Sequence, residues 1–560
     1  MRTGSTLLAA TALIISLGSS VGALPKVSRV GKYLYTDSGN RFFIKGIGYQ
    51  TQGIIVPGPD NVYNQPSTFV DNLADSAGCA RDLPFLQKLG VNAIRAYSAN
   101  SSLDHDACMS ALSDAGIYVI LDLTLPLNGS IDTTLPAWST NTLDQYLRTI
   151  DTFEKYDNIL AYNVGNEVVS PTATQSAPFI VAAARDIRSY LNSISSSALV
   201  GYAAIDGPSS FVDDLADYLA CDHGSGGAAL DLFGLNNYEW CGAAANTTFN
   251  GLNSRYADYP TAAYFSEFGS ENCNPNPRLW TEVPVMFSTP MTDVWSGGSA
   301  FGYFHAISRG HEFGMAAVSA DNTTVTTNGD FDNLAAAYNA VTFVNTPAKG
   351  STSAPSLPAC PSSSAGWPVS TKVPPTPDDA ACGCLADALS CVFSPPTPDY
   401  MILVGDLIGV ACGLADQVGG NCNDISANGA TGVYGAVGMC DPTIKLSYVF
   451  SQYYELNHHA PTACNFSGNA VINTAADVAG AQGAASSCIP SPAVFTPSAP
   501  PVLIPGAGKK YNSTSSNGNS GAGVTSAPSG ATGARGARGA WVGASAALGC
   551  VVGSALWTLV

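Results

Sequence analysis

The sequence predicts an α/β protein, a (β/α)8 TIM barrel followed by a second, smaller, disulfide-rich and mainly helical domain. Strand-like apolar runs alternate with helix-like runs down to about residue 345, which is the order expected of a β/α barrel. The cysteines then fall into two sets, six from Cys79 to Cys360 and eight from Cys382 to Cys488. Two separate sets indicate two separately cross-linked domains.

The elements of the predicted barrel follow the chain in order over residues 24–345. The run 117–123 is apolar almost throughout and ends beside the carboxylate of Asp122, and similar runs recur along this region. A length of about 320 residues suits one barrel with insertions. Eight strands are predicted, at 41–46, 90–97, 117–123, 159–164, 199–204, 232–236, 262–265 and 299–304, with helices at 79–89, 104–115, 142–153 and 177–194.

The beginning of the chain predicts secretion. Residues 1–23 contain a basic Arg2, an apolar stretch over 7–17 and the small residues Val21-Gly22-Ala23, which are the features of a signal peptide. The mature chain is therefore expected to begin near Leu24.

The end of the chain predicts a lipid anchor. Residues 540–560 are apolar and uncharged and no basic residue follows them, which favours a cleaved GPI-attachment signal over a membrane span. The small residues Ser529-Gly530-Ala531 predict attachment at Ser529 and a propeptide over 530–560. Asn519 and Ser526 are rival attachment residues, and a single-pass tail anchor is the alternative.

Composition divides the region between barrel and tail. Residues 346–378 are rich in Pro, Ser, Thr and Ala and predict a linker stapled by Cys360. Residues 379–490 form the cysteine-rich domain, and 491–529 form a Ser/Gly/Pro-rich stalk that cannot bury enough apolar surface to fold. Of fifteen cysteines, Cys550 lies in the predicted propeptide, which leaves an even number whose pairing cannot be deduced by counting. The predicted disulfide cysteines are Cys79, Cys108, Cys221, Cys241, Cys273, Cys360, Cys382, Cys384, Cys391, Cys412, Cys422, Cys440, Cys464 and Cys488.

The charge balance excludes one class of partner. The formal net charge is −19 and charged residues make up only 12% of the chain, so no nucleic-acid partner is expected. In a secreted chain, asparagine sequons predict a glycosylated surface. These sequons lie at Asn100, Asn128, Asn246, Asn322, Asn465 and Asn512.

Two glutamates at predicted strand ends indicate glycosidase chemistry. Glu167 lies in Gly165-Asn166-Glu167, and Glu267 lies in Phe265-Ser266-Glu267-Phe268-Gly269. Barrel enzymes carry their catalytic side chains at the carboxyl ends of strands, and glycoside hydrolysis needs two carboxyl groups flanking the scissile bond. We expect Glu167 to be the acid/base and Glu267 the nucleophile. Glu271, four residues later, is expected to be a surface loop carboxylate.

Aromatic residues near the strand ends are candidates for sugar stacking, because sugar rings present flat C–H faces. Most aromatic residues of a barrel belong to the core, and Tyr238, within Asn237-Tyr238-Glu239-Trp240, is the strongest exception. The candidates are Tyr49, Tyr97, Tyr238, Trp240, Tyr303 and Phe304.

Several motifs together resemble one family, the β-1,3-glucanosyltransferases of glycoside hydrolase family 72. The match runs in order through about residues 25–345. The motifs that carry it are Arg95-Ala96-Tyr97, Gly165-Asn166-Glu167, Asn237-Tyr238-Glu239-Trp240-Cys241-Gly242, Phe265-Ser266-Glu267-Phe268-Gly269 and Val294-Trp295-Ser296-Gly297-Gly298.

The resemblance implies a retaining, GPI-anchored fungal cell-wall enzyme that acts as a monomer at the extracellular face of the plasma membrane and in the wall. Such an enzyme cleaves inside a β-1,3-glucan chain and passes the new reducing end to the non-reducing end of another glucan. Its partners are the donor and acceptor glucan chains, and no metal or organic cofactor is implied. The substrate-binding residues implied are Tyr97, Asp122, Asn166 and Tyr238, around Glu167 and Glu267. Trp240 and Tyr303 are expected to bind substrate as well, as aromatic residues near strand ends.

The cysteine-rich region resembles the carbohydrate-binding module of family 43. The resemblance implies that this region packs on the barrel, where it either binds glucan or braces the fold. Its marks are Cys382-Gly383-Cys384, Leu389-Ser390-Cys391, residues 428–435, Cys440 and Lys445-Leu446-Ser447-Tyr448.

The chain departs from the family pattern next to the predicted site. Ser299-Ala300-Phe301-Gly302-Tyr303 stands where the family has Leu-Val-Tyr-Glu-Tyr, and Phe313 stands where a tyrosine is expected. Each lost hydroxyl removes a hydrogen bond worth about 0.5–1.5 kcal/mol. Acceptor binding is the step most exposed to this change, so two alternatives stay open. One is an endo-β-1,3-glucanase in which hydrolysis dominates, and the other is a non-catalytic glucan-binding scaffold of the wall.

Overall fold

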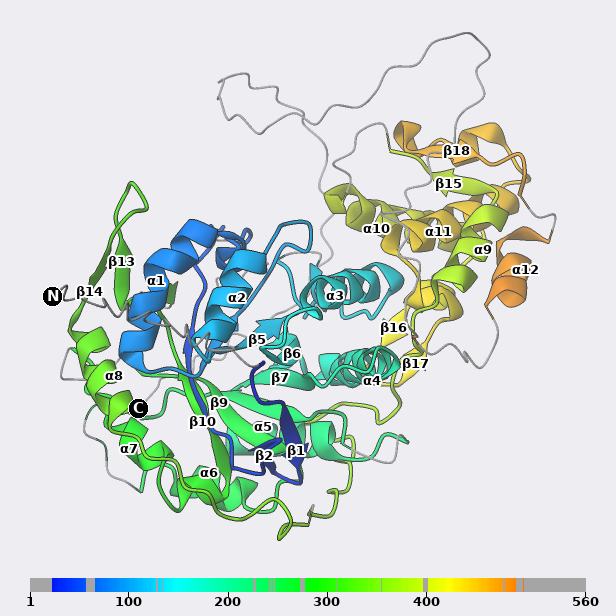
Figure 1. The fold of residues 1–560 in the computed structure, drawn as a ribbon. Coiled ribbons are helices and arrows are strands. Elements are labelled where there is room, and N and C mark those ends of the chain that lie inside the picture. The colour runs from blue at the N-terminus through cyan, green and yellow to red at the C-terminus, as the bar shows by residue number, and fades with distance from the viewer. Residues whose placement is uncertain are drawn as a thin grey trace, which may run out of the picture. The chain divides into compact units, whose positions relative to one another are not determined.

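The computed structural model describes residues 23–56, 66–126, 129–133, 135–224, 228–240, 242, 244, 247–271, 277–308, 310–353, 355–395, 401–476, 479–489 and 497. Eight parallel strands close into a barrel in the order β10-β3-β4-β5-β6-β7-β8-β9, with helices outside it, which confirms the predicted fold class (Figure 1). The strands are β3 Ile44–Gly48, β4 Ala93–Ala96, β5 Tyr118–Asp122, β6 Ile159–Asn166, β7 Leu199–Ile205, β8 Leu232–Asn236, β9 Ala262–Phe268 and β10 Trp295–Ala300.

The barrel helices form where local capping and an apolar face agree. In the first of them, the Asp75 side chain accepts a hydrogen bond from the Gly78 amide, and Gly90 ends the helix in the left-handed conformation. The predicted helix ranges agree with the observed ones to within a few residues. The helices are α1 Ser76–Leu89, α2 Asp106–Asp114, α3 Thr140–Phe153, α4 Ala177–Ser193, α5 Ser209–Ala220, α6 Asn250–Tyr256, α7 Glu282–Met286 and α8 Gly329–Asn339.

The last predicted strand, 299–304, is misplaced, because β10 covers Trp295–Ala300. Paired glycines are typical of turns, so Gly297-Gly298 favoured a turn at the residues that form β10. Here glycine permits a close approach between strands, since a Cβ on Gly298 would lie 2.9 Å from the carbonyl oxygen of Phe265 in β9. Phe301 consequently belongs to the loop that follows β10 at the carboxyl end of the barrel.

A hairpin covers the opposite, amino end of the barrel. Its strands β1 Val27–Val30 and β2 Tyr33–Thr36 are antiparallel. Val27 and Leu34 pack in one apolar cluster with residues that begin the barrel strands, among them Ile44 and Leu232. Two further hairpins follow β10, formed by β11 Ile307–Ser308 with β12 His311–Glu312, and by β13 Ala316–Val318 with β14 Val325–Thr327.

The segment predicted as a linker, 346–378, lies against the barrel. Trp367 is fully buried beside the rings of Phe211 and Tyr218 on α5. A disulfide joins Cys221 at the end of α5 to Cys360. These contacts make the segment part of the folded structure rather than a free tether.

The cysteine-rich domain has its own apolar core and four disulfides, Cys382–Cys440, Cys384–Cys488, Cys391–Cys464 and Cys412–Cys422. In the barrel, Cys79 pairs with Cys108 and Cys221 with Cys360, whereas Cys241 and Cys273 lie outside the described residues. The ring of Tyr434 meets Phe179 of α4 edge to face. The elements of the domain are α9 Asp379–Ala388, β15 Cys391–Phe393, α10 Met401–Gln417, β16 Ala427–Asn428, β17 Val433–Tyr434, α11 Pro442–Leu456, β18 Ala470–Ile472 and α12 Gly480–Cys488.

The predicted processing and anchoring segments fall almost entirely outside the described residues, as do Ser529 and the sequons at Asn128, Asn246 and Asn512. The other sequon asparagines, Asn100, Asn322 and Asn465, are exposed. Within the described part of the chain, no helix is both long and apolar enough to cross a bilayer.

Candidate active site

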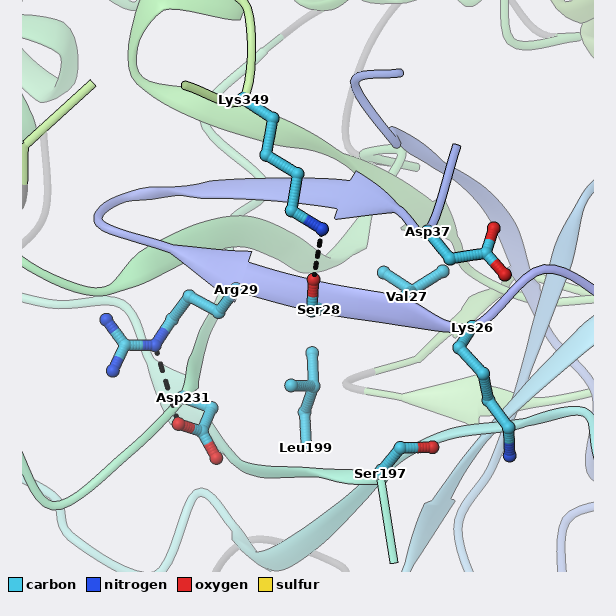
Figure 2. A pocket seen from close by; sticks show the side chains of 9 residues that line it. All are labelled: Lys26, Val27, Ser28, Arg29, Asp37, Ser197, Leu199, Asp231 and Lys349. Atoms are coloured by element: carbon cyan, nitrogen blue, oxygen red, sulfur yellow. Dashed lines mark hydrogen bonds and ion pairs between the residues drawn. The ribbon is translucent and has the colours of Figure 1, made fainter. Parts of the chain in front are cut away.

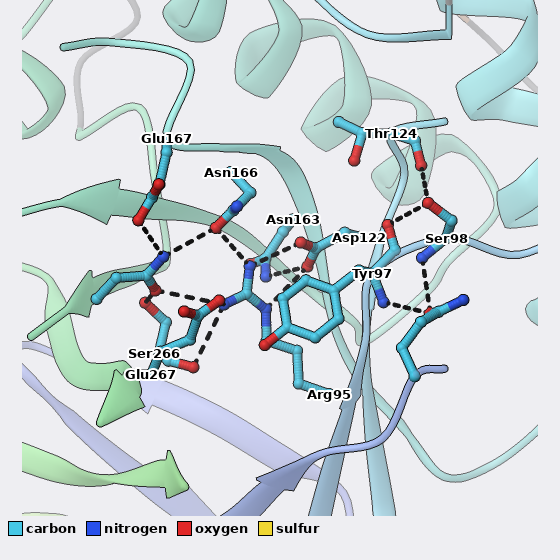
Figure 3. Close-up of polar contacts among 12 residues, drawn as sticks. Arg95, Tyr97, Ser98, Asp122, Thr124, Asn163, Asn166, Glu167, Ser266 and Glu267 are labelled. Carbon is cyan, nitrogen blue, oxygen red and sulfur yellow. Dashed lines mark hydrogen bonds and ion pairs between the residues drawn. The ribbon is translucent and has the colours of Figure 1, made fainter. Parts of the chain in front are cut away.

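The two predicted catalytic glutamates lie at the carboxyl ends of different strands. Glu167 directly follows β6, and Glu267 lies one residue before the end of β9. The backbone of Glu167 has φ 53, a left-handed conformation uncommon outside glycine, and its amide is held by the carbonyl oxygen of Ala203 at 2.8 Å. Strained backbone of this kind clusters at functional sites. Both carboxylates join a single polar network (Figure 3).

Arg95 of β4 lies at the centre of this network, with its side chain 0% exposed. Its Nη2 donates to Asp122 Oδ2 at 2.7 Å and to Asn166 Oδ1 at 2.9 Å, and its Nη1 donates to Glu267 Oε1 at 3.2 Å. A guanidinium removed from water needs such partners to offset its desolvation. One buried cation therefore fixes the positions of Glu267, Asp122 and Asn166 together.

Asn236, the last residue of β8, connects the two glutamates. Its Nδ2 donates to Glu167 Oε1 at 2.8 Å and to Asn166 Oδ1 at 3.1 Å. Its Oδ1 accepts from Ser266 Oγ at 2.7 Å and from Arg95 Nη1 at 3.4 Å. Glu167 and Glu267 are thus held by one chain of hydrogen bonds that runs through Asn236 and Arg95.

The electrostatics of Glu267 reflect opposing influences. The pKa of Glu267 is raised to about 7, chiefly by burial, while Arg95 and the Tyr238 hydroxyl lower this pKa and the nearby Glu167 raises it. Tyr238 donates to Glu267 Oε2 at 2.8 Å. Two carboxylates that influence each other in this way suit a pair that must exchange proton-accepting roles during a reaction.

Four rings make up what we call the aromatic wall, namely Tyr97, Phe301, Phe313 and Tyr238. Phe301 meets Tyr97 at a ring-centroid distance of 6.2 Å and Phe313 at 5.4 Å, both edge to face. Phe313 meets Tyr238 at 5.7 Å. Phe301 and Phe313, the two positions where the family pattern has tyrosine, are therefore the middle of the wall. Tyr238, at one end of the wall, is hydrogen bonded to Glu267.

The structure brings most of the predicted site residues together but not all of them. Asp122, Asn166 and Tyr238 join the network of the two glutamates through the hydrogen bonds above, and the ring centroid of Tyr97 lies 4.4 Å from the guanidinium of Arg95. Tyr303 does not join this network, because it is 0% exposed and its hydroxyl donates to Asp82 Oδ1 at 3.3 Å.

Trp240 likewise lies away from the network. It is 4% exposed, its ring packs on Phe249, and its Nε1 donates to Thr281 Oγ1 at 2.9 Å. Trp240 and Tyr303 thus lie in the core, and neither ring is available to stack on a sugar.

Sequence reasoning did not assign roles to Arg95 and Asn236. A signal was available for Arg95, since a charged residue inside an otherwise apolar strand must have buried partners. Asn236 offered no comparable signal, because polar residues are common where a strand meets a loop.

The prediction for Glu271 is wrong. Its side chain is only 10% exposed and forms an ion pair with Arg278 at 2.8 Å. The pKa of Glu271 is raised to about 7, chiefly by burial, while Arg278 lowers this pKa and Asp330 raises it. This carboxylate is therefore paired with Arg278 and lies beside Asp330.

Among the described residues, one group of potential metal ligands lies together, Cys221, His223 and Cys360. The two sulfurs form a disulfide, so neither offers a thiolate to an ion.

A cavity of about 350 Å³ lies at the amino ends of β7 and β8, by the first hairpin (Figure 2). Its polar side chains bond one another, as Arg29 does with Asp231 at 3.4 Å and Lys349 with Ser28 at 3.1 Å. The cavity is on the opposite end of the barrel from Glu167 and Glu267, so it takes no part in their chemistry.

The comparisons with known proteins agree with this geometry. Residues 19–342 match a family model described as glucanosyltransferase, that of glycoside hydrolase family 72, and residues 389–471 match an X8 domain. The 1,3-beta-glucanosyltransferase gas1 of Schizosaccharomyces pombe is 35% identical over 474 residues, which cover 83% of this chain and 82% of the relative. The 1,3-beta-glucanosyltransferase GAS2 of Saccharomyces cerevisiae is 35% identical over 463 residues, 78% of each chain.

Solved structures give the same result. A complex of ScGas2 with a small compound has a TM-score of 0.71 and 33% identity, covering 81% of this chain and 99% of that one. A glutamate-to-glutamine mutant of Saccharomyces cerevisiae Gas2p in complex with laminaritetraose and laminaripentaose has a TM-score of 0.70 and 31% identity, covering 81% and 96%.

Proposed function

We propose that this chain, a member of the glucanosyltransferase family (glycoside hydrolase family 72), elongates β-1,3-glucan. It cleaves an internal linkage and transfers the new reducing end to the non-reducing end of another glucan. One observation carries the assignment of roles. Glu167 and Glu267 come from the carboxyl ends of two strands and share one hydrogen-bond network through Asn236 and Arg95.

In the first step, Glu267 attacks the anomeric carbon while Glu167 protonates the oxygen of the departing chain. Arg95 and Tyr238 hold the Glu267 carboxylate through its two oxygens, one each, which fixes its direction of attack. Asn166, held by Arg95 and Asn236, is placed beside the same site to contact the sugar 2-hydroxyl. The product of this step is a covalent glycosyl-enzyme.

In the second step, Glu267 is esterified and its negative charge is gone. Glu167 then acts as the base that takes a proton from the 3-hydroxyl of an incoming glucan. Transfer requires that this acceptor outcompete water at about 55 M, which an acceptor held by ring stacking and hydrogen bonds achieves through effective molarity. The partly exposed rings of the aromatic wall, Tyr97, Phe301 and Tyr238, supply the stacking surface next to Glu267. Phe313, which is 8% exposed, packs against Phe301 and Tyr238.

The experiment is incubation of the purified protein with a reduced laminari-oligosaccharide of defined length. Products longer than the substrate support transfer, whereas shorter products alone would identify an endo-β-1,3-glucanase, which the phenylalanines at 301 and 313 favour by removing hydroxyls. Glu267→Gln is the control, and it should abolish turnover while glucan binding persists. Turnover that survives this substitution would refute the assignment of the nucleophile.

We further propose that the protein acts as a monomer outside the cell, attached by a GPI anchor at Ser529 to the plasma membrane and reaching cell-wall glucan. The small-residue triplet at 529–531 and the uncharged tail support this. Release from membranes by a phosphatidylinositol-specific phospholipase tests the anchor. Retention of a full-length tail after that treatment would support a tail anchor instead.

A further inference from the structure

Arg278 lies behind the aromatic wall and is bonded to the backbone that carries it. The side chain is 6% exposed. Its Nη1 donates to the carbonyl oxygen of Phe301 at 2.7 Å, and its Nη2 donates to that of Phe313 at 2.8 Å. The same Nη1 donates at 3.2 Å to the carbonyl oxygen of Gly269, two residues after Glu267. One guanidinium therefore joins the strand of Glu267 to both phenylalanines of the wall.

Arg278 is itself held firmly. Its Nε lies 3.0 Å from Asp330 Oδ2 and 2.8 Å from Glu271 Oε1, and its own amide donates to Asp330 Oδ1 at 2.6 Å. The guanidinium also lies 4.5 Å from the ring centroid of Trp280. Because the guanidinium is held on several sides, its hydrogen bonds fix the carbonyl groups of Phe301 and Phe313.

The adjoining backbone shows how closely this region is packed. Gly269 has φ 109, and a Cβ at that position would lie 2.4 Å from the ring of Trp280. The chain after Glu267 therefore turns directly over the residues that hold Arg278. Phe301 is tied to the same strand, since its amide donates to the carbonyl oxygen of Phe268 at 2.9 Å.

We propose that Arg278 is a positioning residue for glucan binding, which holds the partly exposed Phe301, and the buried Phe313 packed against it, at the place where a sugar ring stacks beside Glu267. The proposal rests on the function proposed above and names a residue on which its substrate binding depends. Arg278 contacts no substrate, and it acts through the backbone of the wall. A lysine keeps the charge but lacks the planar fork that reaches several carbonyls at once, so Arg278→Lys removes the positioning with little change in charge.

The experiment measures binding apart from turnover. Laminari-oligosaccharide affinity is determined by calorimetry for the full chain carrying Glu267→Gln, with and without Arg278→Lys. Losing a well-placed stacking contact corresponds to about a tenfold change in affinity, so we expect Kd to rise about tenfold. In the chain with Glu267 intact, KM should rise by a similar factor, the share of transfer products should fall, and the pH at which kcat/KM declines should not move.

A matched control separates positioning from general stability. Arg41 is another buried arginine, 5% exposed, that donates to two backbone carbonyl oxygens, those of Thr346 at 2.6 Å and Thr292 at 3.1 Å. It precedes β3 at the amino end of the barrel, away from Glu167 and Glu267. Both Arg41→Lys and Arg278→Lys should lower Tm, but Arg41→Lys should leave Kd and KM unchanged.

A double-mutant cycle tests whether Arg278 acts through the wall. Phe301→Ala alone should raise Kd, and adding Arg278→Lys to it should change Kd little further, because the partly exposed ring that Arg278 positions is already gone. Fully additive effects on Kd would overturn the proposal, as would an unchanged Kd in Arg278→Lys or an equal rise of Kd in Arg41→Lys. If the unmodified protein binds the oligosaccharide but gives no products, the proposed function fails and the binding cycle still decides the role of Arg278.

Discussion

Removal of the buried cation at the centre of the site should have two separable effects. In Arg95→Met the side-chain volume is largely kept, but Asp122, whose side chain is 0% exposed, loses its ion pair at 2.7 Å. Stripping one partner from a buried pair leaves an uncompensated charge and lowers the free energy of unfolding by about 3–5 kcal/mol. The change should therefore appear as a clear fall in Tm.

The second effect is on the nucleophile. Arg95 lowers the pKa of Glu267, so its loss raises that pKa, and a larger fraction of Glu267 is protonated at any given pH. Because the attacking form is the carboxylate, the acid limb of kcat/KM should move to higher pH. Each unit of movement corresponds to about 1.36 kcal/mol of lost interaction with the ionised form.

The assay compares Arg95→Met with the double variant Arg95→Met/Asp122→Asn, which removes both charges. Thermal unfolding should show that the double variant regains most of the lost stability, since residue 122 no longer carries a buried charge without a partner, and Glu267 keeps its hydrogen bond from Tyr238. Its kcat/KM against laminari-oligosaccharide should stay low, with the acid limb still displaced, because Glu267 and Asn166 lack their common donor. A double variant no more stable than the single one, or an acid limb that stays in place, would refute the reasoning.

Three further predictions follow from individual contacts. Tyr238→Phe removes a hydroxyl 2.8 Å from Glu267 Oε2, so the acid limb should move to higher pH. Plateau kcat/KM should fall about 10- to 150-fold, because a hydrogen bond to a charged group contributes about 1.5–3 kcal/mol, and an unmoved pH profile would contradict this. Replacing both Cys221 and Cys360 by serine removes a disulfide that spans 139 residues, so the free energy of unfolding should fall by about 4–5 kcal/mol in the chain-entropy model and Tm should fall with it. An unchanged Tm would show that the packing around Trp367 holds this segment in place without the disulfide. Burial and the neighbouring Asp379 raise the pKa of Asp144 from 3.8 to about 7. The folded state therefore holds this proton more tightly than the unfolded state, and stability is lost as pH rises from about 4 to about 7. Asp144→Asn should raise Tm at pH 8 and leave it unchanged near pH 4, and equal effects at both pH values would argue against an interaction between Asp144 and Asp379.

The strand-end positions of the two proposed catalytic carboxylates were predictable because their signals are local. Glu167 and Glu267 each follow an apolar run, and parallel barrel strands present their carboxyl ends on one face, so two such residues meet whatever the details of packing. The barrel order and the helix positions follow from the same kind of local periodicity. The strand at Trp295–Ala300 was missed because its glycines serve a contact with β9 that no local pattern reports.

The rest depended on contacts between distant parts of the chain. Tyr303 and Trp240 lie near strand ends in the sequence, yet both rings turn into the core, toward Asp82 and Phe249. Whether a side chain at a strand end faces the site or the core is set by closure of the barrel and by the loops around it. Disulfide pairing also depends on contacts between distant residues. Counting cysteines does not identify the partners of Cys382 and Cys391, which are set by the packing of the helices.

The sequence by itself determined the barrel, the cross-linked second domain and the two glutamates, because periodicity, cysteine grouping and strand-end carboxylates are properties of neighbouring residues. Only the tertiary structure decided that Arg95 and Asn236 join the glutamates and that Arg278 stands behind Phe301 and Phe313. The physical reason is that a buried guanidinium donates to the acceptors that lie within hydrogen-bond distance, and the folding of distant segments around the barrel sets those distances.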